Sequence, residues 1–240
     1  MDGLIIRPKS TAGQPEGYPG VEVIGRPRLF HDRPNLLLAK RVIDLVICVL
    51  AAPVIVPVMM LCALLVRWDS PGPIIFVQER IGKGGKRFKM FKFRTMPHTQ
   101  DDQPQKEFMK KYVTGELKSD AGGKPVFKPQ ARVTRIGGLL RKTSLDELPQ
   151  LINVVKGEMS IVGPRPNMSA EVEHYKLWQH ERLEVLPGLT GLAQIHGRSS
   201  LEWEQIVQYD IQYIENMSLA LDFEIILKTF VVVLKGLGAR

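Results

Sequence analysis

Residues 45–66, LVICVLAAPVIVPVMMLCALLV, form an uncharged apolar stretch that decides the fold of this chain. At about 1.5 Å per residue, a helix of this length covers roughly 33 Å, which is enough to cross the hydrocarbon core of a bilayer. The stretch begins too late for a signal peptide, and no small-residue cleavage pattern follows it. We therefore predict a membrane helix here.

Two features argue against a straight transmembrane span. Pro53 and Pro57 lie at the centre of the stretch, where each removes a backbone donor and clashes with the preceding turn. Both flanks are basic, with Lys40 and Arg41 before the stretch and Arg67 after it, so the positive-inside rule places both in the cytoplasm. A helix kinked at Pro53 that re-enters the same face satisfies both observations. A plain span and a buried core helix are the alternatives.

The composition narrows the classes of partner. The chain has 240 residues, enough for one domain plus a membrane element, and 33 Lys and Arg against 25 Asp and Glu give a formal charge of +8. This excess suits anionic partners such as phospholipid headgroups, nucleotides or nucleic acids. Both cysteines fall inside the apolar stretch and show neither a disulfide nor a metal-binding spacing, which fits a reduced, cytosol-facing location.

The chain divides into three predicted parts. Residues 1–36 are rich in Pro and Gly without sustained periodicity, which indicates an N-terminal tail. The membrane helix is expected over residues 37–68. Residues 69–240 are expected to form a small soluble α+β domain, with a short helix around residues 106–113 inside a polar, Pro- and Gly-containing excursion.

A hairpin is predicted at the start of this domain. Two short strands, at residues 74–77 and 87–94, flank the glycine-rich segment 82–86. That segment lacks the spacing and the Ser or Thr of a phosphate-binding loop, so a hairpin turn is the better interpretation. The apolar positions change phase between Met90 and Phe91, which predicts a β-bulge there.

The strongest chemical signal is the adjacent pair Asp146 and Glu147, which lies just behind Arg141 and Lys142. A carboxylate that can attack or hold a metal, next to cations that can hold phosphate charge, is what phosphoryl chemistry requires. In segment 163–166, Gly-Pro-Arg-Pro, an arginine is held between two residues of fixed φ, which suits bidentate phosphate binding. A rigid surface turn with a solvated arginine is the alternative.

The carboxylate pair also has a purely structural interpretation. Ser144 as N-cap with Glu147 at the third helical position would form a capping box. Pro149 complicates that cap, so the helix is alternatively expected to begin nearer Glu147, which leaves Asp146 on the entering turn. In either case a helix N-terminus offers amide donors to a phosphate.

The last apolar segment, residues 219–234, is interrupted by Asp222, Glu224 and Lys228. It is too short and too charged to span a bilayer, yet too apolar for an ordinary solvated helix. We predict an amphipathic helix that lies at the membrane interface. A core helix packed under the strands is the alternative.

Taken in chain order, five motifs resemble those of the bacterial sugar transferase family, the monotopic phosphoglycosyl transferases. They are Lys40-Arg41-x-x-Asp44, Lys92-Phe93-Arg94-Thr95-Met96, and the segments 143–151, 163–166 and 187–198. The resemblance covers roughly residues 37–236. It implies a re-entrant helix that anchors an α/β-associated catalytic domain to the cytoplasmic face of the inner membrane.

The resemblance also implies an activity and its partners. A sugar 1-phosphate would move from a nucleotide diphosphosugar, UDP-linked and of hexose type, onto polyprenyl phosphate, with release of the nucleoside monophosphate. Such a step initiates surface glycan assembly. Membrane lipids are further expected partners, nucleic acid is not expected, and a homo-oligomer is left open.

Roles for single residues follow from the same resemblance. Asp146 matches the nucleophile that forms a covalent phosphosugar intermediate, and Glu147 matches its partner, which is associated with Mg²⁺. The residues expected to contact substrate phosphates or to support the site are Lys92, Arg94, Arg141, Pro164, Arg165, Pro166, Arg198 and Asp222.

Two other classes of function compete with this interpretation. A nucleic-acid-binding protein would explain the basic charge, but its cations would be clustered and the apolar stretch would have no role. A non-catalytic membrane scaffold would explain the anchor but leaves Asp146, Glu147 and Arg165 without a purpose.

Overall fold

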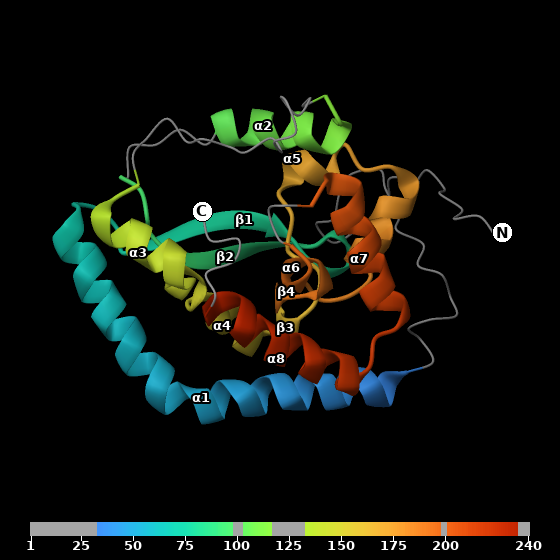
Figure 1. Cartoon of the computed structure of the whole chain (residues 1–240), viewed down its shortest axis with the longest axis horizontal. Coiled ribbons are helices and arrows are strands. Elements are labelled where there is room, and N and C mark those ends of the chain that lie inside the picture. The colour runs from blue at the N-terminus through green and yellow to red at the C-terminus, as the bar shows by residue number, and fades with distance from the viewer. Residues whose placement is uncertain (1–32, 98–102, 117–132, 198–200, 235–240) are drawn as a thin grey trace, which may run out of the picture.

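The computed structural model describes residues 33–97, 103–116, 133–197 and 201–234. Its longest element is helix α1 (Pro34–Asp69), which contains Pro53 and Pro57 and starts three residues before the predicted position 37. Figure 1 shows that α1 bends midway and that the bend points away from the rest of the molecule. Prolines inside a helix are the usual cause of such a bend.

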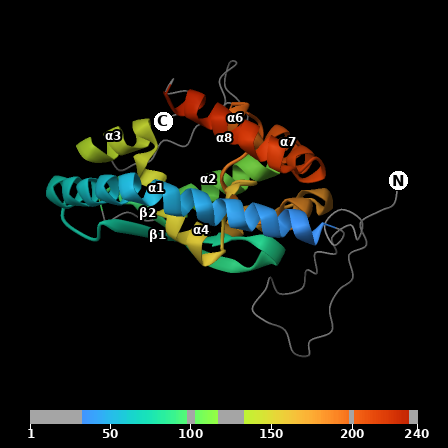
Figure 2. The ribbon, with the colours of Figure 1, turned by 90° about the horizontal axis from the view of Figure 1, so that it is seen from below.

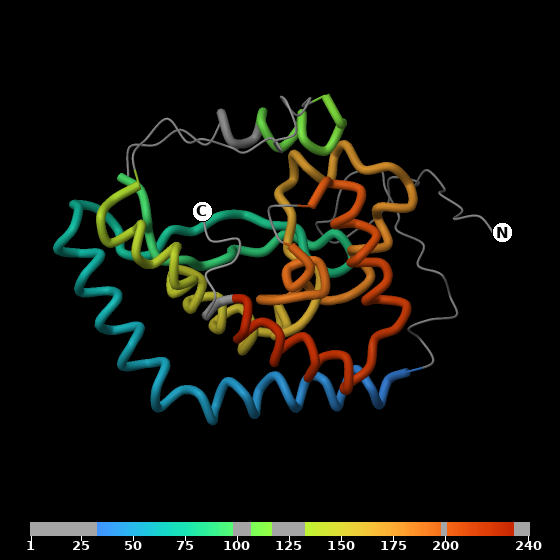
Figure 3. Tube along the Cα trace, viewed as in Figure 1, coloured from blue at the N-terminus to red at the C-terminus, as the bar shows by residue number. Residues whose placement is uncertain are grey.

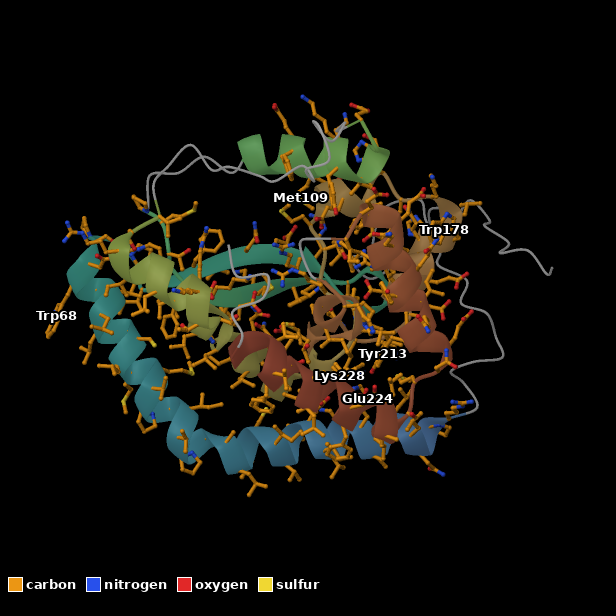
Figure 4. The ribbon with its side chains drawn as sticks, in the orientation of Figure 1. Trp68, Met109, Trp178, Tyr213, Glu224 and Lys228 are labelled. Carbon is orange, nitrogen blue, oxygen red and sulfur yellow. The ribbon has the colours of Figure 1, made fainter. Side chains whose placement is uncertain are left out.

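Within the described residues, α1 is the one helix long and apolar enough to cross a membrane, and only 11% of its most apolar window is buried. A core helix would be mostly buried, so this alternative does not fit. The exposed large apolar side chains include Val49, Leu50, Val54 and Met60. Trp68, near the C-terminal end, projects outward with 80% of its surface exposed (Figure 4).

Both ends of α1 are fastened to the rest of the fold. Near the first end, Arg41 donates to two carbonyls at the C-terminus of α4 (Gln150–Lys156), at 2.5 and 2.8 Å. At the other end, the carboxylate of Asp69 accepts from the backbone N–H of Ile136 at 3.0 Å, in the first turn of α3 (Arg135–Thr143). These bonds satisfy backbone groups that helix ends otherwise leave unpaired.

The predicted hairpin is present as strands β1 (Ile75–Ile81) and β2 (Arg87–Phe93), joined by the 3₁₀ turn η1 (Lys83–Gly85). The strands pair antiparallel and one to one along their whole length, so the predicted bulge at Met90 is wrong. The change of phase has another cause. Met90 packs against residues of α4 and β3, whereas Phe93 packs on the opposite face against α1 and α3.

A second, parallel pair of strands, β3 (Ser160–Val162) and β4 (Gly188–Thr190), lies next to α8 (Leu219–Leu234). Its cluster of buried side chains includes Val162, Tyr213 and Ile225. The other elements are α2 (Gln103–Thr114), α5 (Ser169–Val172), η3 (Leu177–Leu183), α6 (Leu192–Ile195) and α7 (Trp203–Glu215). The expected helix at 106–113 is thus part of α2.

Seen from below, α1 crosses the front of the molecule, with the hairpin and α4 lower in the view and α7 and α8 higher (Figure 2). Helix α8 has two apolar faces. Ile225 is fully buried against the core, while Phe223, Leu227 and Phe230 are 51 to 67% exposed. Glu224 and Lys228 form an exposed ion pair along the helix at 2.6 Å (Figure 4). The outer face has the pattern of an interfacial helix, and the inner face that of a core helix.

Candidate active site

The Asp146–Glu147 pair lies on a short turn between two helices. Helix α3 ends at Ser144, whose left-handed backbone (φ 58°) is the one positive φ outside glycine in the described residues. A single 3₁₀ turn, η2 (Leu145–Glu147), follows, and α4 then begins. Figure 3 traces this continuous stretch beside the hairpin. Backbone held in such a sparsely populated region costs free energy and is frequent at active sites.

The capping-box interpretation is wrong, because the side chain of Ser144 makes no capping hydrogen bond. Glu147 instead turns toward cations. Its Oε1 accepts from Lys92 Nζ at 3.2 Å and from both Nη atoms of Arg165 at 3.4 Å. A strand residue and a loop residue, 55 and 18 positions away, therefore meet on one carboxylate. The fold thus brings together three of the predicted site residues.

Burial raises the pKa of Asp146 to about 6, and the negative charge of Glu147 adds to this effect. The charges of Lys92, Arg141 and Arg165 oppose the rise. Burial lowers the pKa of Arg141, while the nearby Asp146 opposes that shift. Asp146 is therefore ionised at neutral pH but only weakly compensated, which leaves a carboxylate that can act as a nucleophile.

Lys92 and Arg165 are tuned in opposite directions. Burial lowers the pKa of Lys92, although Glu147 opposes this. The negative charge of Glu147 raises the pKa of Arg165. The ion pairs with Glu147 favour the charged form of both groups, and a cationic group there can hold a phosphate oxygen.

Arg165 is exposed, yet its backbone is held on both sides. The carbonyl of Pro164 accepts from Gly188 N at 2.8 Å, and that of Pro166 accepts from Arg80 Nη1 at 3.1 Å. Gly163 permits the close approach, because a Cβ there would lie 2.4 Å from the carbonyl oxygen of Leu186. The rigid segment predicted from the two prolines is present, and it places Arg165 on Glu147.

Arg80 is a site residue that sequence reasoning missed. It is 7% exposed, and it bonds Pro166 and the side chain of Gln78, while Glu171 lies 3.9 Å away. The predicted strand ended at residue 77, so Arg80 fell outside any element. A charged residue three positions beyond a predicted strand, next to the charged Glu79, gives no signal of burial.

Arg141 lies on the last turn of α3 and points back to the end of the hairpin. Its Nε donates to the hydroxyl of Thr95 at 2.9 Å. Three cations, Lys92, Arg141 and Arg165, therefore act on Asp146, and Arg80 is a fourth whose charge interacts with Glu147. Even with Glu171 beside Arg80, positive charges outnumber negative ones. Such a site is suited to an anion of several charges.

Two predicted site residues lie away from the carboxylate pair. Arg94 is 4% exposed and donates to the carbonyls of Ser70 and Pro71 at 2.6 and 2.9 Å, while its backbone N–H continues the hairpin pairing with Ile74. It fastens α1 and is not on the carboxylate pair.

Asp222 is also away from the pair. It is 7% exposed and bonds Lys40 Nζ and the hydroxyl of Tyr213, each at 2.7 Å. Its register on α8 places it on the inner face with Ile225, so it joins α8 to α1. Figure 4 shows Tyr213 on α7 beside α8. Arg198 lies outside the described residues.

Comparison with known proteins places the chain in a family. A sequence model described as "Bacterial sugar transferase" matches residues 35–236. The chain belongs to the bacterial sugar transferase family. Exopolysaccharide production protein ExoY of Sinorhizobium fredii is 40% identical over 86% of this chain and 90% of its own length.

Longer relatives are similar over part of their length. Galactosyl transferase CpsE of Streptococcus agalactiae is 38% identical over 93% of this chain, which spans 48% of CpsE. UDP-glucose:undecaprenyl-phosphate glucose-1-phosphate transferase of Escherichia coli is 42% identical over 83% of this chain and 40% of its own length. The chain thus spans about half the length of these two relatives.

The carboxylates of Asp146 and Glu147 are the groups at this site that would bind a metal ion. No cluster of three or more His, Cys, Asp or Glu side chains occurs in the described residues. Mg²⁺ commonly takes one or two carboxylates and completes its shell with water and substrate phosphates. The carboxylates of the consecutive residues Asp146 and Glu147, which act on each other electrostatically, offer ligands of this kind, so the residues present fit this ion.

Proposed function

We propose that this chain transfers a sugar 1-phosphate from a UDP-sugar to polyprenyl phosphate and thereby initiates assembly of a surface glycan or exopolysaccharide. The observation that carries the proposal is Asp146, a half-buried carboxylate facing Lys92, Arg141 and Arg165 beside a second carboxylate. The activities for which relatives at 38 and 42% identity are named support this class of substrate. They favour a hexose donor, either UDP-glucose or UDP-galactose.

In the first step, an oxygen of Asp146 attacks the phosphorus that carries the sugar. A bond forms between the carboxylate oxygen and phosphorus, the bond to the bridging oxygen of the diphosphate breaks, and UMP leaves with that electron pair. Attack of one anion on another is repulsive, so Arg141, Arg165 and Lys92 must hold the phosphate oxygens. The product is a mixed anhydride between Asp146 and the sugar phosphate.

In the second step, a phosphate oxygen of polyprenyl phosphate attacks the same phosphorus. The anhydride bond breaks, Asp146 leaves as a carboxylate, and polyprenyl diphosphosugar is formed. With a pKa of about 6, Asp146 is ionised to attack at neutral pH, and it stays acidic enough to leave as a carboxylate in the second step. Bound at Glu147 and Asp146, Mg²⁺ would neutralise charge on the diphosphate.

We also propose that α1 is re-entrant and that the domain lies on the cytoplasmic face of the inner membrane. Arg41 at one end of α1 and Asp69 at the other bond helices of the same folded domain, which supports placing both ends on one side of the bilayer. The bend and the exposed apolar side chains between these ends support insertion of the bend. The exposed face of α8, with Phe223, Leu227 and Phe230, would lie among the lipids at the interface.

The test is a panel of nucleotide sugars incubated with undecaprenyl phosphate and Mg²⁺, with released nucleoside monophosphate as the readout. Wild-type protein should release UMP from a UDP-hexose over repeated turnovers only when the lipid is present. Asp146→Asn should reduce turnover to background, because the amide cannot attack. Retained turnover of a few per cent or more in Asp146→Asn would contradict the covalent route, and no turnover with any donor would contradict the proposed function.

A further inference from the structure

Directly after β2, the adjacent residues Arg94 and Thr95 contact different helices. Arg94 holds the end of α1, as described above, whereas Thr95 is 8% exposed and faces α3. Thr95 is fixed through its backbone as well, since its carbonyl accepts from Thr134 N at 3.1 Å. It is therefore a rigid part of the fold.

Helix α3 approaches Thr95 unusually closely. A Cβ at Gly137 would lie 2.3 Å from the carbonyl oxygen and 2.7 Å from the Cα of Thr95, so only glycine permits this contact. Arg141 lies four residues after Gly137, one turn along the same face of the helix. The close approach at Gly137 thus sets how far the side chain of Arg141 lies from Thr95, and its Nε reaches the threonine hydroxyl at 2.9 Å.

The bond to Thr95 has a consequence for the guanidinium of Arg141. This group is planar and has five N–H donors, of which one belongs to Nε and four to the two Nη atoms. Once Nε is bonded, the plane is fixed and the Nη edge is directed away from Thr95. In the described residues neither Nη atom of Arg141 has a hydrogen-bond partner, so that edge is free to bind a phosphate in bidentate fashion.

We propose that Thr95 is a positioning residue for the transfer reaction, whose hydroxyl orients Arg141 so that both Nη atoms face the phosphate attacked by Asp146. The inference rests on the proposed function. A free arginine side chain can rotate about several bonds, and loss of its orientation would misplace the group that holds developing charge. Misplacement of a catalytic contact by about 1 Å can reduce the rate by about a hundredfold.

The decisive comparison uses Thr95→Val, which keeps the shape of the side chain and removes the hydroxyl, and Thr95→Ser, which keeps the hydroxyl. With UDP-glucose or UDP-galactose, whichever wild-type protein turns over, we expect Thr95→Val to lower kcat by about 10- to 100-fold. Thr95→Ser should stay within about threefold of wild type, because it can still accept from Arg141 Nε.

A double-mutant cycle separates positioning from a general structural effect. Arg141→Lys retains the positive charge but has no Nε for the threonine to orient. In the Arg141→Lys background, Thr95→Val should therefore have less than about a twofold further effect. A residue that merely stabilised the fold would lower the active fraction equally in both backgrounds, and this result would overturn the inference.

A second pair of variants covers the case in which Thr95→Val does not fold. Thr95→Ser and Thr95→Cys both lose the methyl group, but sulfur is a weak acceptor, so only the serine variant should retain kcat. Equal kcat in these two variants would overturn the inference. Turnover by wild-type protein in the same experiment would still support the proposed function. Absence of turnover by wild-type protein with any donor would overturn both together.

Discussion

Asp146→Asn should make the metal-free protein more stable at neutral pH while it abolishes turnover. Burial and the neighbouring charge of Glu147 raise the pKa of Asp146 from 3.8 to about 6 in the folded state. The protonated group therefore favours folding below about pH 4, and this contribution is lost as pH rises through about 6. Asparagine has the same shape and never ionises, so the variant avoids that loss.

The size of the effect follows from the two pKa values. A change of one in pKa corresponds to about 1.36 kcal/mol, so a difference of about 2 sets an upper limit of about 3 kcal/mol above pH 7. Asp146 is half-buried, and screening by solvent reduces this to about 1–2 kcal/mol. For a chain of this size the variant should unfold about 2–8 °C higher at pH 8.

The assay is thermal unfolding in detergent with EDTA, for wild type, Asp146→Asn and the control Asp146→Glu, at a series of pH values from 4.5 to 8. The stability gained by the asparagine variant should grow with pH, and the glutamate variant, which keeps its charge, should show no such growth. A difference between Asn and wild type that is equal at pH 4.5 and pH 8 would refute the reasoning, because Asp146 would then carry no raised pKa.

Four further outcomes are expected. Arg165→Gln should lower turnover by more than tenfold and move the acid limb of the rate profile at saturating Mg²⁺ to higher pH, since Arg165 lowers the pKa of Asp146; an unmoved limb contradicts that coupling. Glu147→Gln should weaken the Mg²⁺ dependence of turnover, and an unchanged titration removes Glu147 from that role. Single cysteines at positions 30 and 83, in a background without native cysteines, should both react only from the cytoplasmic side; labelling from opposite sides indicates a full span. A fluorophore at Phe230→Cys should be quenched by brominated lipids and one at Glu215→Cys should not, whereas no quenching at either would place α8 away from lipid.

The chemistry of the site was more predictable from sequence than its supporting contacts. Asp146 and Glu147 are adjacent in the chain, and two prolines fix the backbone around Arg165, so local sequence alone indicates their geometry. Lys92 was assigned from the resemblance of the motif Lys92-Phe93-Arg94-Thr95-Met96 to that of the family. The meeting of Lys92 and Arg165 on Glu147 depends on the fold, and no spacing in the sequence specifies it.

Arg94, Asp222 and Arg80 show that a sequence motif indicates which residue types are present better than it indicates what each side chain bonds. Strand alternation puts Arg94 on the same face as Lys92, but the guanidinium of Arg94 bonds the carbonyls of Ser70 and Pro71 just after α1. Asp222 lies in an apolar helix whose inner and outer faces are both hydrophobic, so the sequence pattern does not indicate which face it occupies. Arg80 was not predicted as a site residue. A buried charge needs partners, and the partners of Arg80 come from distant segments that its local sequence does not indicate.

These contacts give the bent helix a second role besides anchoring. The carboxylate pair lies between α3 and α4, and α1 bonds the far end of each: Asp69 holds the first turn of α3, and Arg41 holds the last turn of α4. The separation of these two bonds is set by the bend of α1. A straight helix of the same length would move its ends apart, and the two helices that flank Asp146 could not both remain attached. The geometry that keeps α1 bent is therefore the same geometry that holds the carboxylate pair between its cations.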